Sequence, residues 1–259
     1  MVFLFIYPFS LNCNNFISTM YSICKKELRQ FFSGLTGYIA IILFLVVNGL
    51  FLFVLKDSNI FDFGYASLDK FFELAPWILL FLLPALTMRS LSDEFKGGTF
   101  EILKTKPITL VQIVLGKYFA ILVILLFVIL PTLVYIITIK ALSTQGGIDG
   151  GGILGSYIGL FFLGAVFAAI SLCCSGFTNN AVIAFLISVF GCIILYFGFN
   201  ALSKLPFFEN GVDYYVEMLG IDFHYSSISR GVLDSRDVVY FFSMIFLFLL
   251  VTVKTLSKK

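Results

Sequence analysis

Side chains able to do chemistry concentrate in one stretch of this sequence, from Arg89 to Thr109, which mixes acids, bases and hydroxyls with apolar residues. Gly97 and Gly98 should interrupt any helix there, because glycine is a poor helix former. A stretch of about 20 residues is longer than the roughly two to eight residues that join two packed helices. We therefore expect an ordered helix–turn–helix elbow whose mixed tip docks on another protein. An ordinary solvated connector is the alternative.

The elbow carries the signals of a short helix between two longer ones. Thr99 could cap the short helix, and Ile102 with Leu103 would form its apolar side. Pro107 would end it, since proline cannot continue a helix, and Thr109 could cap the long helix that follows. The short helix is therefore expected between Thr99 and Pro107.

A second polar element occupies residues 20–34, just before the first apolar stretch. Apolar side chains recur there at three- and four-residue steps, and the basic residues fall largely on the other face. The charged residues of this element are Lys25, Lys26, Glu27 and Arg29. An amphipathic helix of this kind can lie in a membrane interface. A simple positive-inside anchor, which needs no partner, explains the same residues.

Catalytic and metal-binding patterns are absent from the sequence. The one histidine, His224, allows no cluster of His ligands, and a lone His is more often a satisfied surface or interface residue than a ligand. Gly116 and Lys117 do not stand in a phosphate-binding G-x-x-x-x-G-K-[ST] loop, so ATP would have to bind to another polypeptide. The five cysteines contain no C-x-x-C pair. The absence of these patterns disfavours a membrane enzyme such as an intramembrane protease or lipid transferase.

The composition is that of a membrane protein. Of the 259 residues 60% are hydrophobic and 12% charged, against about 45–50% and about 25% in soluble domains. The mean hydropathy is +1.04, and 33 phenylalanines leave too little polar surface to cover a water-facing sphere. Soluble, disordered and nucleic-acid-binding classes are excluded.

Charge-free windows locate the membrane spans. Each window is long enough, or nearly so, to cross a hydrocarbon core, and a polar break at residues 175–180 divides the longest. The windows predict six spans, at about 35–55, 74–91, 118–139, 153–174, 181–202 and 238–254. The predicted fold class is therefore an all-α membrane protein with a transmembrane domain over 35–256. Within it, Gly155-x-x-x-Gly159 allows close helix contact, either inside the chain or at a dimer interface.

The distribution of basic residues orients the spans. Six spans put both termini on one side together with the 89–117 loop, and that side carries eleven Lys and Arg against six on the other. The positive-inside rule makes this side cytoplasmic.

The first 19 residues are expected to be an upstream extension. Residues 1–11 are apolar but too short to span a membrane. No basic residue precedes Lys25, so a signal peptide is disfavoured. Met20 follows a polar patch and is the expected natural start.

Two segments resemble those of one transporter family. The entrance sequence Lys-Lys-Glu-Leu-Arg-Gln-Phe-Phe (25–32) and the elbow sequence of residues 89–109 resemble the ABC-2 type permeases, membrane subunits of one class of ATP-binding-cassette transporter. The resemblance extends from Met20 to the C-terminus and is strongest to the permeases associated with gliding motility in the Bacteroidetes. Permeases of nitrous oxide reductase maturation are similar neighbours.

The resemblance implies specific roles for the two segments. In the family the elbow carries a cytoplasmic coupling helix that docks on a separate ATPase, and the entrance helix also lies against that ATPase. The positions that match the coupling segment are Glu94, Gly97, Gly98, Thr99, Glu101, Lys104 and Pro107. The family's external loop, here residues 203–237, holds short helices that dip back into the outer leaflet.

The resemblance also implies the setting of the protein. It implies a multi-pass protein of the bacterial inner membrane, with no cofactor in this chain and with ATP and Mg on the partner ATPase. The implied partners are that cassette ATPase, a second permease chain or an extracellular-domain partner, and membrane lipid, without nucleic acid. A structural anchor or a secondary transporter without an ATPase is the remaining alternative. Neither cargo nor mechanical output can be chosen from the sequence.

Overall fold

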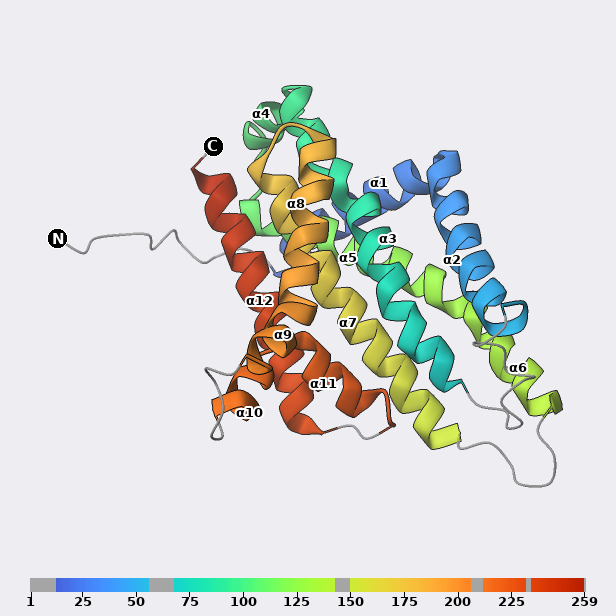
Figure 1. The fold of residues 1–259 in the computed structure, drawn as a ribbon. Helices are drawn as coiled ribbons and strands as arrows, with labels where there is room; N and C mark the ends of the chain where they lie inside the picture. The colour runs from blue at the N-terminus through green and yellow to red at the C-terminus, as the bar shows by residue number, and fades with distance from the viewer. Residues whose placement is uncertain (1–12, 56–67, 143–149, 206–211, 232–233, 259) are drawn as a thin grey trace.

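A computed structural model describes residues 13–55, 68–142, 150–205, 212–231 and 234–258. These residues form helices, with no strand among them (Figure 1). The longer helices are α1 (Cys13–Ser33), α2 (Leu35–Phe53), α3 (Asp69–Lys96), α5 (Leu110–Ile129), α7 (Gly150–Phe177), α8 (Ala181–Ile193) and α12 (Ser235–Ser257). The shorter elements are α4 (Thr99–Lys104), η1 (Leu130–Thr132), α6 (Leu133–Leu142), η2 (Ile194–Gly198), α9 (Phe199–Ser203), α10 (Val212–Glu217) and α11 (Ile221–Ile228). The all-α prediction is confirmed.

Five stretches of helix are long and apolar enough to cross a membrane. They are Asp69–Lys96, Leu110–Lys140, Gly150–Phe177, Ala181–Ser203 and Ser235–Ser257. A sixth is reached when the segments Phe16–Ser33 and Gly37–Phe53, bent by 70° against each other, are counted as one span. The five coincide with the last five predicted spans, and α2 occupies the first. The chain is therefore a multi-pass membrane protein with five to six candidate spans.

The helix that enters the membrane domain begins earlier than expected. The amphipathic helix was expected over residues 20–34, whereas α1 runs from Cys13 to Ser33 and so includes residues 13–19. Gly34 then adopts an extended conformation and α2 begins at the next residue. Residues 1–12 lie outside the described part of the chain, and the Met20 start stays a prediction.

The centre of the bundle is α7, which packs against α3, α5, α8, α11 and α12. Glycines let its neighbours approach closely. A Cβ on Gly159 would lie 2.5 Å from Ile228 Cγ2, and one on Gly164 would lie 2.7 Å from Leu125 Cδ2. A Cβ on Gly155 would lie 3.0 Å from the Gly231 oxygen. The Gly155-x-x-x-Gly159 pattern thus serves packing within the chain.

The elbow helix α4 and the helices α10 and α11 lie at opposite ends of the bundle (Figure 1). Three membrane-length stretches separate α4 from α10 along the chain. An odd number of crossings puts the two helices on opposite sides of a membrane. The short helices expected in the 203–237 loop are present as α10 and α11.

This arrangement predicts the outcome of cysteine labelling. Ile102 on α4 is 62% exposed and Tyr215 on α10 is 70% exposed. We expect Ile102→Cys to react with an impermeant reagent only from the cytoplasm and Tyr215→Cys only from outside, as the basic-residue asymmetry indicates. Phe100 is unsuitable as the labelling site, since it is 4% exposed. Labelling of both positions from one side would overturn the topology.

Candidate functional site

The elbow forms because the chain turns sharply between α3 and α4. α3 ends at Lys96, and Gly98 has a φ of 66°, a left-handed conformation that glycine adopts at little cost. The Gly98 N–H still donates to the Phe95 carbonyl at 3.3 Å. The predicted break at Gly97 and Gly98 and the short helix after it are thus confirmed, with Gly98 setting the direction in which α4 leaves α3.

Two details of the predicted elbow are corrected. Thr99 was expected to cap α4, but it is the first helical residue, and its hydroxyl donates backwards to the Glu94 carbonyl at 3.3 Å. The apolar side was expected at Ile102 and Leu103. The buried residue is Phe100 instead, whose ring packs edge-on against that of Phe95 at 4.9 Å.

The outer face of α4 is left uncovered within the described chain. Ile102 is 62% exposed, and Glu101 and Lys104 are exposed beside it, the Lys104 ammonium lying 5.3 Å from the Phe100 ring centre. Pro107, also exposed, follows the helix. This face combines one large apolar side chain with charges of both signs, a composition suited to a protein interface.

The helix after the elbow starts as expected. Thr109 accepts a hydrogen bond from the Gln112 N–H at 3.3 Å, and the Gln112 side chain accepts one from the Thr109 N–H at 2.8 Å, which completes a capping box. The Gln112 amide also donates to the Phe16 carbonyl of α1 at 3.4 Å. The start of α5 is therefore tied to the interface helix.

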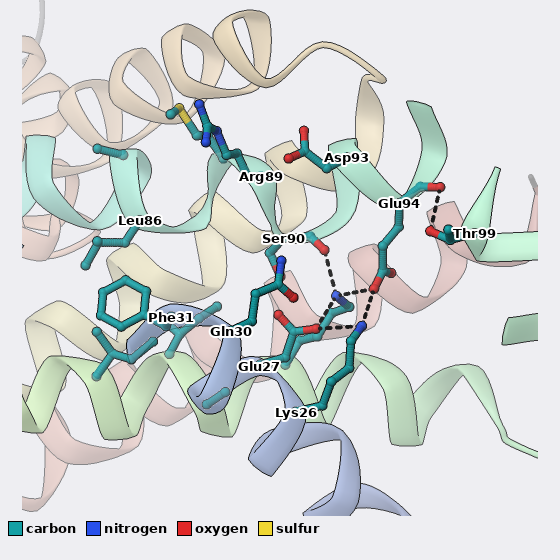
Figure 2. A pocket seen from close by; sticks show the side chains of 16 residues that line it. Lys26, Glu27, Gln30, Phe31, Leu86, Arg89, Ser90, Asp93, Glu94 and Thr99 are labelled. Atoms are coloured by element: carbon teal, nitrogen blue, oxygen red, sulfur yellow. Dashed lines mark hydrogen bonds and ion pairs between the residues drawn. The ribbon is translucent and has the colours of Figure 1, made fainter. Parts of the chain in front are cut away.

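A buried lysine connects the interface helix, the end of α3 and α5. The Lys117 side chain is 1% exposed, and its ammonium lies 3.0 Å from Glu27 Oε1 of α1 and 2.8 Å from Glu94 Oε1 of α3. It also donates to the Ser90 carbonyl at 2.6 Å. Lys26 lies 3.3 Å from the same Glu94 oxygen and 3.5 Å from Glu27 (Figure 2). We call these four residues, Lys26, Glu27, Glu94 and Lys117, the ion-pair cluster.

The ion-pair cluster is electrically balanced, with two cations and two anions. Burial lowers the pKa of the Lys26 ammonium, but the charges of Glu27 and Glu94 and their hydrogen bonds outweigh it, so the net shift is upward. The second carboxylate oxygen of Glu94, Oε2, is buried without a hydrogen-bond partner. The resemblance placed Glu94 in the segment that docks on a separate ATPase. Its partners in the structure are internal, which makes it a link between helices.

Close packing of α1 on α5 brings the cluster together. A Cβ on Gly116 would lie 2.9 Å from Ile23 Cβ and 3.0 Å from the Met20 carbonyl oxygen. The missing side chain lets α1 cross α5 one residue before Lys117. The sequence does carry a signal for this site. Lys117 directly follows a glycine and is the last charged residue before a long apolar stretch.

A second link joins the end of α3 to the central helix α7. The Ser175 hydroxyl accepts from the backbone N–H groups of Leu91 and Ser92, at 3.1 and 3.2 Å, and donates to the Met88 carbonyl at 3.1 Å. Three hydrogen bonds to one side chain hold α3 against α7 just before the elbow. Residues 175–180 were singled out in the sequence only as a helix break.

The other basic residues predicted for the interface helix, Lys25 and Arg29, are exposed on α1, in keeping with a basic interface face. A cavity of about 560 Å³ lies between α1, α3 and α5, with the ion-pair cluster in one wall and Phe31 and Leu86 among the apolar residues of another (Figure 2). Within the described residues, no group of three or more His, Cys, Asp or Glu side chains could hold a metal ion.

The described residues thus form a helical membrane domain in which a polar elbow is tied to an interface helix. The chain belongs to the ABC-2 family of transporter proteins: residues 33–197, more than half of its length, match the family described as ABC-2 family transporter protein. This family is the transmembrane component of a transporter and not its ATPase. A search of curated proteins gives no match.

Proposed function

We propose that this chain is the permease subunit that couples ATP hydrolysis by a separate cassette ATPase to movement of its membrane helices. The observation that carries the proposal is the connection of α4. Its outer face is exposed, while its base is bonded through Glu94 and Lys117 to α1 and α5 and adjoins the Ser175 contact with α7. A movement of α4 would therefore be transmitted to α1, α5 and α7 together.

The coupling proposal divides the predicted residues into two groups. Glu101, Ile102 and Lys104 form the contact surface for the ATPase, because they are exposed on α4. The ion-pair cluster, formed by Lys26, Glu27, Glu94 and Lys117, carries the motion inward. Gly97, Gly98, Thr99 and Pro107 shape the elbow between the two groups. ATP and Mg belong to the ATPase subunit in this scheme.

The finer assignment follows the resemblance of the entrance helix and the elbow. It makes the chain the permease of a gliding-motility-associated complex in a bacterial inner membrane of the Bacteroidetes type, with both termini in the cytoplasm. A second permease chain or an extracellular-domain partner would complete the complex. Deletion of the gene should then abolish gliding while leaving growth intact; undiminished gliding would remove this assignment without touching the permease role.

The test of the coupling role is co-purification from the native membrane. We expect the tagged full chain, solubilised in mild detergent, to retain a cassette ATPase in a stable ratio. Hydrolysis by the retained ATPase should exceed that of the same ATPase isolated. Recovery of the chain without any ATPase, even after crosslinking in the native membrane, would favour an anchor or a secondary transporter.

A further inference from the structure

At the end of the bundle opposite α4, the turn between α10 and α11 is held by two successive carbonyl groups. The Met218 carbonyl oxygen lies 2.9 Å from His224 Nε2 of α11. The Leu219 carbonyl accepts a hydrogen bond of 2.7 Å from the Tyr240 hydroxyl of α12. The rings of His224 and Tyr240 stack at 3.9 Å between centroids. The two rings thus attach the turn to α11 and α12, in addition to the backbone hydrogen bonds of the turn itself and the packing of α10 on α9.

The other ring nitrogen of His224 faces a carboxylate. Nδ1 lies 2.7 Å from Asp237 Oδ1, and the two side chains are 4% and 7% exposed. Asp237 Oδ2 is buried without a hydrogen-bond partner. The lone histidine, expected to be a satisfied surface or interface residue, is therefore satisfied but buried, in a contact between α11 and α12.

The hydrogen bonds of His224 depend on how many protons the His224–Asp237 pair holds. Both partners of the imidazole are oxygens, and a carbonyl oxygen can only accept. A neutral imidazole has one N–H, so with an ionised Asp237 it satisfies one contact and leaves two acceptors facing each other at the other. Both contacts form only when the pair holds one further proton. Asp237 lies in the first turn of α12, where the helix dipole favours its anionic form, so that proton resides on the imidazole.

We propose that His224 and Asp237 form a proton-dependent latch that holds the α10–α11 turn against α12. With its proton the latch is closed, because the imidazolium donates to both Asp237 and the Met218 carbonyl. When the proton leaves, the remaining N–H stays with the carboxylate, the stronger acceptor. The lone pair on Nε2 then faces the Met218 carbonyl, and the turn is released. The latch does not depend on the ATPase partner.

The neighbouring ionisable groups on α10, α11 and α12 are either bonded to other residues or exposed. On α11, Asp222 is engaged by Asn200 at 3.4 Å, and Tyr225 donates to the Phe72 carbonyl at 2.7 Å. From α12, Tyr240 bonds Leu219, Asp234 caps the helix, and Arg236 is exposed. From α10, Glu217 bonds Asn200 at 3.5 Å, and Asp213 is exposed. Arg230 bonds the Ser226 carbonyl at 3.0 Å. Among these groups Asp237 is the one ionised side chain that contacts the imidazole.

The sign of the pH dependence follows from the proton count. The closed state binds one proton more than the open state, so its stability relative to the open state falls as pH rises. Within the range of histidine titration, the released state is therefore expected at the alkaline end.

The test is a distance measured across the latch, in the full chain reconstituted in lipid nanodiscs. Nitroxide labels at Tyr215→Cys on α10 and Val239→Cys on α12 occupy positions that are 70% and 67% exposed. Electron paramagnetic resonance then gives the distance distribution between about pH 5 and about pH 9, a range that brackets histidine titration. We expect a single narrow distribution at the acid end and a broader, longer one at the alkaline end.

Three variants separate the latch from a merely structural contact. Asp237→Asn replaces the carboxylate by an amide that can donate to Nδ1, so a neutral imidazole satisfies both contacts; the narrow distribution should persist at every pH. His224→Phe keeps the stacking on Tyr240 but loses both hydrogen bonds, and should give the broad distribution at every pH. Asp213→Asn, an exposed residue of α10, should behave as the unsubstituted chain. An unsubstituted chain insensitive to pH, or an Asp237→Asn variant that still opens at high pH, would overturn the proposal.

Discussion

Replacing Lys117 by Met should destabilise the membrane domain by about 3–5 kcal/mol, the usual cost of removing one partner from a buried ion pair. Glu27 and Glu94 would remain largely buried, with only Lys26, which is 56% exposed, to balance their charges. For a chain of this size the apparent melting temperature should fall by roughly 10 °C. The measurement is thermal unfolding of the purified protein in detergent, followed by loss of the monodisperse peak.

The matched control for this prediction is Lys140→Met, at an exposed position in the last turn of α6, which should change the melting temperature little. A triple variant that combines Lys117→Met with Glu27→Gln and Glu94→Gln removes the uncompensated charges and should recover most of the loss. If Lys117→Met melted like the unsubstituted protein, the ion-pair cluster would have no part in holding α1 and α3 on α5.

Replacing Ile102 by Glu should reduce ATPase co-purification at least about tenfold, or about 1.4 kcal/mol, because it puts a charge on the apolar centre of the proposed contact surface. The side chain is 62% exposed, so insertion and melting temperature should not change. Tyr215→Glu, at an exposed aromatic position on α10, is the control and should retain the ATPase. Equal ATPase recovery from the two variants would remove α4 from the interface.

Gly98→Pro tests the geometry of the elbow separately from its surface. Proline fixes φ near −65° and has no N–H, whereas Gly98 has a φ of 66° and donates to the Phe95 carbonyl. We expect loss of ATPase binding to the same extent as with Ile102→Glu, with the chain still inserted. Gly150→Pro, at the first position of α7 where proline is tolerated, should retain binding. Normal ATPase recovery with Gly98→Pro would show that the direction of α4 is unimportant.

Much of the membrane architecture could be predicted because its signals are local. Uninterrupted apolar windows define helices, since no other backbone conformation satisfies its hydrogen bonds in a bilayer except a closed barrel. The turn at Gly98 and the cap at Thr109 depend on residues within one helical turn of each other, so their spacing in the chain was sufficient. Helix ends were less predictable: α3 extends from Asp69 to Lys96, beyond the predicted 74–91, because a helix continues past the hydrocarbon boundary.

The contacts that give the elbow and the latch their chemistry were decided by the tertiary structure alone. Lys117 lies 90 positions from Glu27 in the chain, and Ser175 lies 84 from Leu91. No local pattern pairs residues so far apart. Glu94 looked like a docking charge because sequence shows a side chain's type but not which way it faces, and packing turned it toward Lys117. His224 became a buried partner of Asp237 in the same way, because α11 folds back onto α12.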